Sequence, residues 1–470
     1  MADSVTKPPA TNAPPSPPAR LPIGFIFSMW KGLLLVVALI GAVGSSYDTS
    51  TELLFASAAA AYTDDDGDIP THKLVTVMFE SVPIIGTLVS QLTRWDALYF
   101  VKSAQRGYLF EQEWAFGIGQ PTIVATLLQG CNSMAINLGV HVDGATAAMG
   151  IVVSIAAHLY AVHALYALVV LLSGNKRLAY VSAVLHIFSP AGMFLVAPYS
   201  EAPFAYLAFT GLLRYAETLA LQRGSWERVK KTLWAGVLLG LATACRSNGL
   251  LYGLVFALDL LEALSGFASA PSKVRALVSL IATGLAGVFV GLGSLLPQLA
   301  GYRHFCQNTL GDAPEWCDYL VPSIYNHVQS RYWNVGFLRY WTPGNIPLFA
   351  LAAPMLYILV VSSHQTLSAS PTTKTSRSVC CPAEKSPYST FVKSLALGQV
   401  ILAFLALTSY HVQIITRLAS GYPLWYIWTA EQLSSSKDVA RMLTGRKIVS
   451  YMVAYALIQG LLYVSFLPPA

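Results

Sequence analysis

Charged residues are scarce in this sequence. Asp, Glu, Lys and Arg make up only 11% of its 470 residues, whereas 55% are hydrophobic. Soluble domains carry about 25% charged residues, so this composition excludes a soluble globular protein and indicates one that is integral to a membrane. No polar segment is long enough to bury a core of its own, and therefore no large soluble domain is expected. Lys and Arg occur in short blocks between apolar runs, which argues against a nucleic-acid partner.

Cysteine patterns typical of metal sites are also missing. The six cysteines form no CxxC pair and no His/Cys cluster with zinc spacing, so no zinc site of this kind is predicted, and no cofactor is expected. The acidic run TDDDGD, residues 63–68, lacks the spacing and the closing Glu of a calcium loop and is interpreted as a turn. Cys306 and Cys317 share one hydrophilic loop, and a disulfide between them is expected if that loop faces an oxidising lumen.

Apolar runs of about 20 residues, the length that spans a bilayer, recur along the chain. They predict an all-α, polytopic membrane protein of about ten or eleven transmembrane helices. Residues 1–22 form a Pro-rich cytosolic tail that is expected to be disordered, and residues 23–470 a single multi-pass domain. The predicted spans are residues 23–44, 146–172, 178–197, 202–221, 233–248, 249–265, 276–298, 344–362, 394–411, 420–433 and 448–467.

The distribution of basic residues predicts the orientation. With the N-terminus in the cytosol, most Lys and Arg residues fall on the cytosolic side, as the positive-inside rule requires. Two long loops, residues 45–145 and 299–343, then face the other side. The Ser-, Thr- and Pro-rich loop 363–393 lies in the cytosol and is interpreted as a flexible connector.

One stretch, RWDALYFVKSAQRGYLFEQEWAF at residues 94–116, gathers charges and aromatic rings. A helix from Trp95 to about Arg106 would present one aromatic and basic face, which suits a helix lying on the membrane surface. Asp96 points about 100° away from that face and has no cation at i+3 or i+4. Its carboxylate is therefore a candidate general base. The alternative is a helix cap, with Arg94 as a possible ion-pair partner.

Further candidates lie near the same membrane face. Glu111 follows closely and either binds sugar hydroxyls or a metal ion, or is a solvated loop acid. Glu201 stands at a span end in SPAGMFLVAPYSEAPF. Arg246 and Asn248, in ATACRSNGLLYG, interrupt an apolar run; an Arg at this depth suits a phosphate group, and the alternative is a polar turn whose Arg reaches interfacial water. The aromatic and basic RYWNVGFLRYWTPGNIP carries Trp333 and Asn334, and TRLASGYP carries Arg417.

These residues resemble a known family. RWDALYFVKSAQRGYLFEQEWAF is similar to the WDA-type motif of the second GPI mannosyltransferases, called PIG-V in animals, and of their fungal counterparts. SPAGMFLVAPYSEAPFAYLAF, CRSNGLL and YWNVGFLRYW also resemble blocks of this family, whereas GIGQP departs from the FFPLYP-like residues of many relatives, which bears on the local loop shape. The residues that match the WDA-type motif are Trp95, Asp96, Ala97, Tyr99, Phe100, Gly107, Tyr108, Glu111, Ala115 and Phe116.

The resemblance implies a GT-C glycosyltransferase in the endoplasmic reticulum membrane, with lumenal interfacial helices and a lumenal active site. Its substrates would be dolichyl phosphate mannose and mannosylated glucosaminyl-phosphatidylinositol, joined through an α-1,6 linkage with inversion. Asp96 would be the catalytic base, and a small membrane partner subunit is a further implication. No metal is required where an Arg neutralises the leaving phosphate. The candidate substrate-binding residues are Arg94, Trp95, Tyr99, Glu111, Glu201, Arg246, Asn248, Trp333 and Asn334.

Two other functions fit the same features. A multi-pass transporter of a sugar or an anionic lipid-linked substrate would bind its substrate near the bilayer midplane, between related broken helices. No pair of matching broken helices is evident in the sequence. A non-catalytic scaffold subunit would use the charged aromatic loops only as a partner surface. A glycosyltransferase instead predicts a cavity at the lumenal interface that Asp96 lines.

Overall fold

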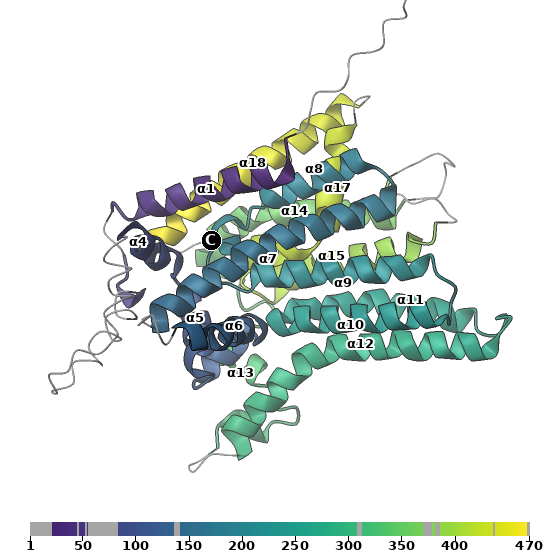
Figure 1. Cartoon of the computed structure of the whole chain (residues 1–470), viewed down its shortest axis with the longest axis horizontal. Helices are drawn as coiled ribbons and strands as arrows, with labels where there is room; N and C mark the ends of the chain where they lie inside the picture. The colour runs from purple at the N-terminus through teal and green to yellow at the C-terminus, as the bar shows by residue number, and fades with distance from the viewer. Residues whose placement is uncertain are drawn as a thin grey trace, which may run out of the picture.

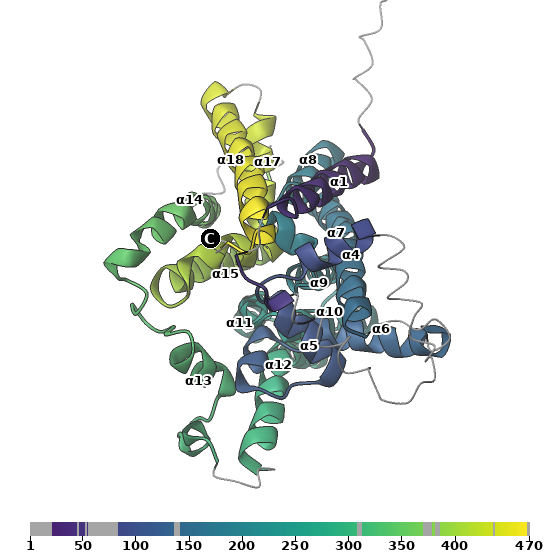
Figure 2. The same ribbon diagram turned by 90° about the vertical axis from the view of Figure 1, so that its left-hand side faces the viewer.

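The structure of the chain is a computed structural model that describes residues 21–44, 47–51, 54, 83–135, 142–307, 313–369, 378–380, 386–435 and 438–467. Within these residues every regular element is a helix, so the predicted all-α fold is confirmed. Most of the tail 1–22 and the acidic run 63–68 fall outside the described residues. The long helices lie side by side, and several short helices gather at one end of the bundle (Figures 1 and 2).

Each predicted span corresponds to a described helix. Seven stretches of the described residues are long and apolar enough to cross a membrane, which confirms a multi-pass membrane protein. The helices that overlap the eleven predicted spans are α1 (Ile23–Gly41), α7 (Val142–Ser173), α8 (Lys176–Ile187), α9 (Glu201–Leu219), α10 (Trp226–Cys245), α11 (Gly253–Ser265), α12 (Lys273–Tyr302), α14 (Ile346–Leu367), α15 (Ser389–Thr408), α17 (Leu424–Ser434) and α18 (Val439–Val464).

Shorter helices connect these spans. They are α4 (Pro83–Leu92), α5 (Ala97–Arg106), η1 (Glu111–Phe116), α6 (Gly119–Ala135), η3 (Gly192–Leu195), η4 (Ser247–Tyr252), η5 (Arg303–Gln307), η6 (Glu315–Asp318), α13 (Ile324–Arg331), η7 (Pro343–Asn345), η8 (Val412–Ile414), α16 (Ile415–Leu418) and η9 (Ala419–Gly421). Helices α4, α5, α6 and α13 lie at the same end of the bundle, towards the left of Figure 1. The predicted loops 45–145 and 299–343 therefore contain folded helices.

The predictions of one span over residues 178–197 and of another over residues 420–433 are wrong, because α8 has only 12 residues and α17 only 11. Helix α8 ends at Ile187, and its 12 residues extend only about 18 Å, less than the ~30 Å of a bilayer core. Pro190 lacks a backbone N–H and disfavours helical geometry in the residue before it, which ends the helix. The chain continues as the buried η3 and irregular segments, and Lys31 of α1 donates a hydrogen bond to the Leu195 carbonyl at 2.9 Å. This segment leads directly to the start of α9.

Helix boundaries elsewhere follow local capping. Helix α10 begins earlier than predicted, after Ser225, whose side chain accepts a hydrogen bond from the Arg228 N–H. It ends at Cys245 because Arg246 is extended, with φ −149° and ψ 127°. Helix α14 continues to Leu367, so the connection to α15 is shorter than the predicted loop 363–393.

Helices α10 and α12 pack backbone to backbone through glycines. A Cβ on Gly240 would overlap the Phe289 carbonyl oxygen, and one on Gly293 would overlap the Gly240 carbonyl oxygen. Small residues permit this close approach in membrane bundles, where packing rather than water drives helix association. The pair matters for the site because the segments at the ends of both helices supply side chains to it.

Gly240→Ala is expected to destabilise the protein by about 1–3 kcal/mol, because the new methyl meets backbone atoms that cannot rotate away. The measurement is thermal unfolding in detergent. Gly284→Ala, on α12, is the matched control, because a Cβ there meets no other atom within 4 Å. Equal melting temperatures for the two variants would contradict the close packing.

Candidate active site

Residues of α5 and α13, among others, line a cavity of about 660 Å³. Both helices lie at the same end of the bundle (Figure 1). This volume is within the range of about 300–1,000 Å³ typical of ligand sites. Tyr199 and several stretches far apart in the sequence line it. These stretches fall within residues 95–100, 114–117, 243–250, 293–298, 323–335 and 410–418.

Four charged side chains form one network at this cavity. The Arg417 guanidinium lies between two carboxylates, with Nη1 3.1 Å from Asp96 Oδ2 and Nε 2.8 Å from Glu201 Oε1. Arg246 Nη1 is 2.7 Å from the same Glu201 oxygen. Asp96, Arg246 and Arg417 line the cavity, whereas Glu201 is fully buried behind them. Two cations thus balance two carboxylates in a partly dry environment, where each interaction is stronger than in water.

Asp96 occupies the position before α5, but its side chain makes no capping hydrogen bond. The interpretation of Asp96 as a side-chain cap is therefore wrong, and its ion pair is with Arg417 rather than with Arg94. Trp95 has φ 55°, a left-handed conformation that is uncommon for residues with a Cβ, so α5 starts at Ala97 instead of Trp95. The Asp96 side chain is 31% exposed and faces the cavity.

Arg417 is held from two sides. Its guanidinium carbon lies 4.3 Å from the ring centroid of Phe194 in η3 and 5.0 Å from that of Tyr199, in the segment between η3 and α9. Burial lowers the pKa of Arg417, but Glu201 and Asp96 raise it by more, so the group stays a cation. The rings and the carboxylates leave this guanidinium little freedom to reorient.

Arg246 extends into the cavity from the break between α10 and η4. The predicted polar turn is present, but the side chain is only 13% exposed and contacts Glu201 rather than interfacial water. Its Nη1 also donates a hydrogen bond of 3.4 Å to Ser200 Oγ. The break in the apolar run therefore places a cation beside the carboxylates.

Two predicted residues offer unused donors to the cavity. Trp95 Nε1 and Asn248 Nδ2 are buried and have no hydrogen-bond partner within the described part of the chain. Both residues line the cavity. Because buried polar groups are nearly always hydrogen-bonded, these atoms suit the hydroxyl or phosphate oxygens of a ligand.

Trp333 and Tyr99 contribute through an aromatic cluster. Trp333 lines the cavity, and its ring meets Phe116 edge-on at 5.3 Å. Tyr99 of α5 does not line the cavity. Its ring stacks on the Phe116 ring of η1, with 4.9 Å between the two ring centroids. Desolvation, with smaller contributions from Asp96 and Glu113, raises the pKa of Tyr99, so its phenol remains protonated.

Besides Tyr99 and Glu201, three more predicted substrate-binding residues are not among those that line the cavity. Arg94 is 1% exposed, and its Nη2 donates to Gln91 Oε1 at 3.0 Å. Glu111 accepts hydrogen bonds from the Trp316 and Tyr332 side chains. Asn334 adopts φ 50° between two cavity-lining neighbours. The structure therefore gives these residues supporting positions rather than direct access to a ligand.

Other cavity residues were absent from the predicted set. Arg417 stood out only as a charge in an apolar region, the one signal that could have found it. Tyr199, Tyr325, Gln329 and His411 are polar or aromatic residues of common kinds, and nothing in their spacing marked them. They meet only because distant segments converge.

A disulfide joins Cys306 to Cys317, with 5.7 Å between their Cα atoms. This is the pairing expected from their position in one hydrophilic loop. The bond ties η5, which follows α12, to η6, next to a small apolar cluster of Trp114, Trp316, Ile324 and Val328. It therefore lies at the same end of the protein as Asp96.

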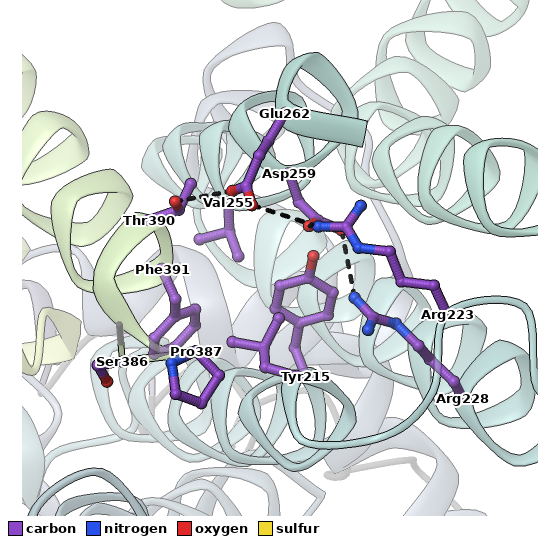
Figure 3. A pocket seen from close by; sticks show the side chains of 11 residues that line it. Tyr215, Arg223, Arg228, Val255, Asp259, Glu262, Ser386, Pro387, Thr390 and Phe391 are labelled. Atoms are coloured by element: carbon purple, nitrogen blue, oxygen red, sulfur yellow. Dashed lines mark hydrogen bonds and ion pairs between the residues drawn. The ribbon is translucent and has the colours of Figure 1, made fainter. Parts of the chain in front are cut away.

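A second, smaller cavity of about 220 Å³ lies among α9, α10, α11 and α15 (Figure 3). Its charges pair with one another: Arg223 Nη2 is 3.1 Å from Asp259 Oδ1, and Arg228 Nη2 is 3.8 Å from Asp259 Oδ2. Thr390 of α15 donates to Glu262 Oε2 at 2.8 Å. These contacts connect α11 to α10, to α15 and to the segment between α9 and α10. The cavity is smaller than typical ligand sites.

The fold and the site define a multi-pass membrane protein with a carboxylate and two guanidiniums at one cavity, a set of groups suited to group transfer. The profile described as "Mannosyltransferase (PIG-V)" matches residues 70–470. The chain therefore belongs to the PIG-V mannosyltransferase family and is a glycosyltransferase, so the transporter and scaffold alternatives are not supported.

Several relatives are similar over most of their length. GPI mannosyltransferase 2 of Chaetomium globosum is 42% identical over 94% of this chain and 95% of its own. GPI mannosyltransferase 2 of Gibberella zeae is 40% identical, with 95% and 96% covered. GPI alpha-1,6-mannosyltransferase 2 of Cricetulus griseus is 32% identical, with 76% of each chain covered.

Among solved structures, the Archaeoglobus fulgidus oligosaccharyltransferase in the apo form matches with a TM-score of 0.42 and 11% identity. The match covers 83% of this chain and 57% of that protein, so this chain spans little more than half its length.

Proposed function

We propose that this enzyme transfers the second mannose of the GPI anchor, forming an α-1,6 linkage to the first mannose of the precursor. Relatives named GPI mannosyltransferase 2, and one named GPI alpha-1,6-mannosyltransferase 2, support this acceptor and linkage. The single observation that carries the proposal is the convergence of Asp96, Arg246 and Arg417 on one cavity. We further infer a GT-C type of architecture from the family resemblance.

The proposed donor is dolichyl phosphate mannose, whose sugar is β-linked. Asp96 takes the proton from the C6 hydroxyl of the acceptor mannose. The resulting oxygen forms a bond to the anomeric carbon of the donor from the opposite face. The bond from that carbon to the phosphate oxygen breaks, and dolichyl phosphate leaves with the bonding pair. One inversion at this carbon converts the β-linked donor into the α-linked product.

The two guanidiniums are proposed to stabilise the leaving phosphate. Arg246 and Arg417 both line the cavity with Asp96. Fixed cations stabilise charge that develops in the transition state, because they need not reorganise during the reaction. Arg417 also orients the base through its contact with Asp96. With two cations at the phosphate, the reaction as proposed does not require a metal ion.

We place the active site in the lumen of the endoplasmic reticulum. A disulfide at the end of the bundle that carries Asp96 favours an oxidising compartment on that side. Most basic residues lie towards the other side, which favours a cytosolic N-terminus. The proposed enzyme spans the membrane many times, and a small membrane partner subunit remains part of the proposal from the family resemblance.

The test is transfer by the purified protein in lipid nanodiscs, with dolichyl phosphate mannose as donor and mannosylated glucosaminyl-phosphatidylinositol as acceptor. The expected product carries one added mannose that an α-1,6-specific mannosidase removes. A product resistant to this enzyme would contradict the linkage. Transfer from GDP-mannose, but not from the lipid donor, would contradict the proposed donor.

Arg246→Ala is expected to raise the KM for the donor and lower kcat, together by about 10²-fold in kcat/KM, because one cation at the phosphate is lost. The measurement is transfer at several donor concentrations. Arg214→Ala is a control, since Arg214 is exposed and pairs only weakly with Glu217 on the same helix. Unchanged donor kinetics for Arg246→Ala would remove this residue from the phosphate site.

A further inference from the structure

Helix α13 and the residues that follow it form one wall of the cavity, here named the α13 wall and defined as residues 323–335. Six of its residues line the cavity. Its start is fixed to α12, because Gln298 Oε1 accepts hydrogen bonds from Ser323 Oγ at 3.0 Å and the Tyr325 N–H at 3.1 Å. The other end of the wall, towards residue 335, is held by contacts with other side chains.

Glu111 supplies one such attachment and contacts both flanks of α13, while His411 Nε2 lies 3.0 Å from the Trp333 carbonyl oxygen. Its Oε1 accepts a hydrogen bond of 2.7 Å from Trp316 Nε1, which precedes the helix. Its Oε2 accepts one of 2.9 Å from the hydroxyl of Tyr332, the first residue after the helix. His327 Nε2, within the helix, lies 3.5 Å from the same oxygen. One carboxylate therefore contacts the chain before, within and after α13.

The same residue is part of the segment that carries the catalytic candidate. Glu111 is the first residue of η1, and the end of η1 reaches the cavity at Trp114, Ala115 and Phe116. Phe116 stacks on Tyr99 of α5, the helix that Asp96 precedes. Through Glu111, the Asp96 segment and the α13 wall are joined by side-chain hydrogen bonds.

The connection is buried on the side of Trp316, whereas Tyr332 is 46% exposed. The side chain of Glu111 is 14% exposed, so it is not a solvated loop acid, and Trp316 is fully buried. Desolvation and the hydrogen bond to Glu111 raise the pKa of Tyr332, so the phenol stays protonated and remains a donor. Hydrogen bonds to an ionised carboxylate are about twice as strong as neutral ones.

We infer that Glu111 is a positioning residue that fixes the α13 wall relative to Asp96 and thereby sets substrate affinity, without touching the substrate. This inference goes beyond the proposed function and rests on it for the identity of the substrates. It predicts that loss of the carboxylate loosens α13 and raises KM more than it lowers kcat.

The first test is hydrogen exchange of the purified protein in nanodiscs. In Glu111→Gln, the amide oxygen accepts one of the two hydrogen bonds. The NH₂ group is itself a donor and therefore does not accept the other. Backbone amides of α13 are therefore expected to exchange about tenfold faster than in the wild type. Glu315→Gln, the same charge change at an exposed position of η6, is the matched control and should leave exchange unchanged. Equal protection of α13 in both variants would overturn the inference.

The second test is steady-state transfer. Glu111→Gln is expected to raise KM for at least one substrate by about tenfold while kcat changes less than about threefold. Tyr332→Phe removes one donor while keeping the ring, so it should produce a smaller shift of the same kind, and it serves if Glu111→Gln folds poorly. A fall in kcat with unchanged KM would overturn the positioning role, because it would place Glu111 in the chemical step.

The two proposals fail in different ways. If the wild type does not transfer mannose from the lipid donor, the proposed function fails. The exchange experiment still decides the role of Glu111, since it requires no substrate.

Discussion

Mannose transfer by the Asp96→Asn variant is expected to fall by about 10²–10⁴-fold, the usual contribution of a general base. The amide has nearly the shape of the carboxylate but does not accept the proton of the acceptor hydroxyl at neutral pH. Asp96 is the carboxylate that is both partly exposed and at the cavity, whereas Glu201 is fully buried. The measurement is rescue of surface GPI proteins in cells lacking the second GPI mannosyltransferase, with in vitro kinetics of the purified variant.

Asp48→Asn is the matched control for this experiment. Asp48 is partly exposed, lies in the same predicted lumenal loop, and accepts a hydrogen bond from the Ser50 N–H at 2.6 Å. It should support wild-type rescue. Asp96→Glu should keep part of the activity, since a base remains but its oxygen atoms are displaced. Full rescue by a well-expressed Asp96→Asn variant would end the general-base hypothesis.

Arg417→Ala is expected to lower kcat by about 10²–10³-fold and to destabilise the protein by about 3 kcal/mol. The substitution removes the cation between Asp96 and Glu201 and leaves Glu201, which is fully buried, with Arg246 as its remaining ion pair. A buried carboxylate that loses one of its two cations destabilises the folded protein, and this accounts for the expected loss of stability. Kinetics and thermal unfolding in detergent measure the two effects separately.

Arg417→Lys separates charge from geometry. A single ammonium group keeps the charge but does not reproduce the fork in which Nε contacts Glu201 and Nη1 contacts Asp96. Its stability should therefore recover more than its kcat. Arg214→Ala, at an exposed ion pair, controls for loss of a guanidinium elsewhere. Wild-type kcat and donor KM in Arg417→Ala would show that Arg417 has only a structural role.

The motif at residues 94–116 contains features that the sequence predicts and others that it does not. The predicted start of α5, Trp95, lies within two residues of the observed start. This prediction succeeds because the helical period of apolar and polar residues can be seen within the segment itself. The left-handed backbone of Trp95 was not predicted, since no Gly or Asn marks it. Glu111 was interpreted as a sugar ligand, but its partners lie more than two hundred residues away, at Trp316 and Tyr332.

By itself, the sequence determined that this is a helical, multi-pass membrane protein, because scarce charge and repeated apolar runs leave no other way to satisfy the backbone. It also determined where the charged motifs lie and, through them, the family. Only the tertiary structure decided that Arg417 binds Asp96 across 321 residues and that Glu201 joins Arg417 to Arg246. Charge pairing depends on distance in space, and helices of similar apolar pattern can pack in many arrangements that the sequence pattern alone does not distinguish.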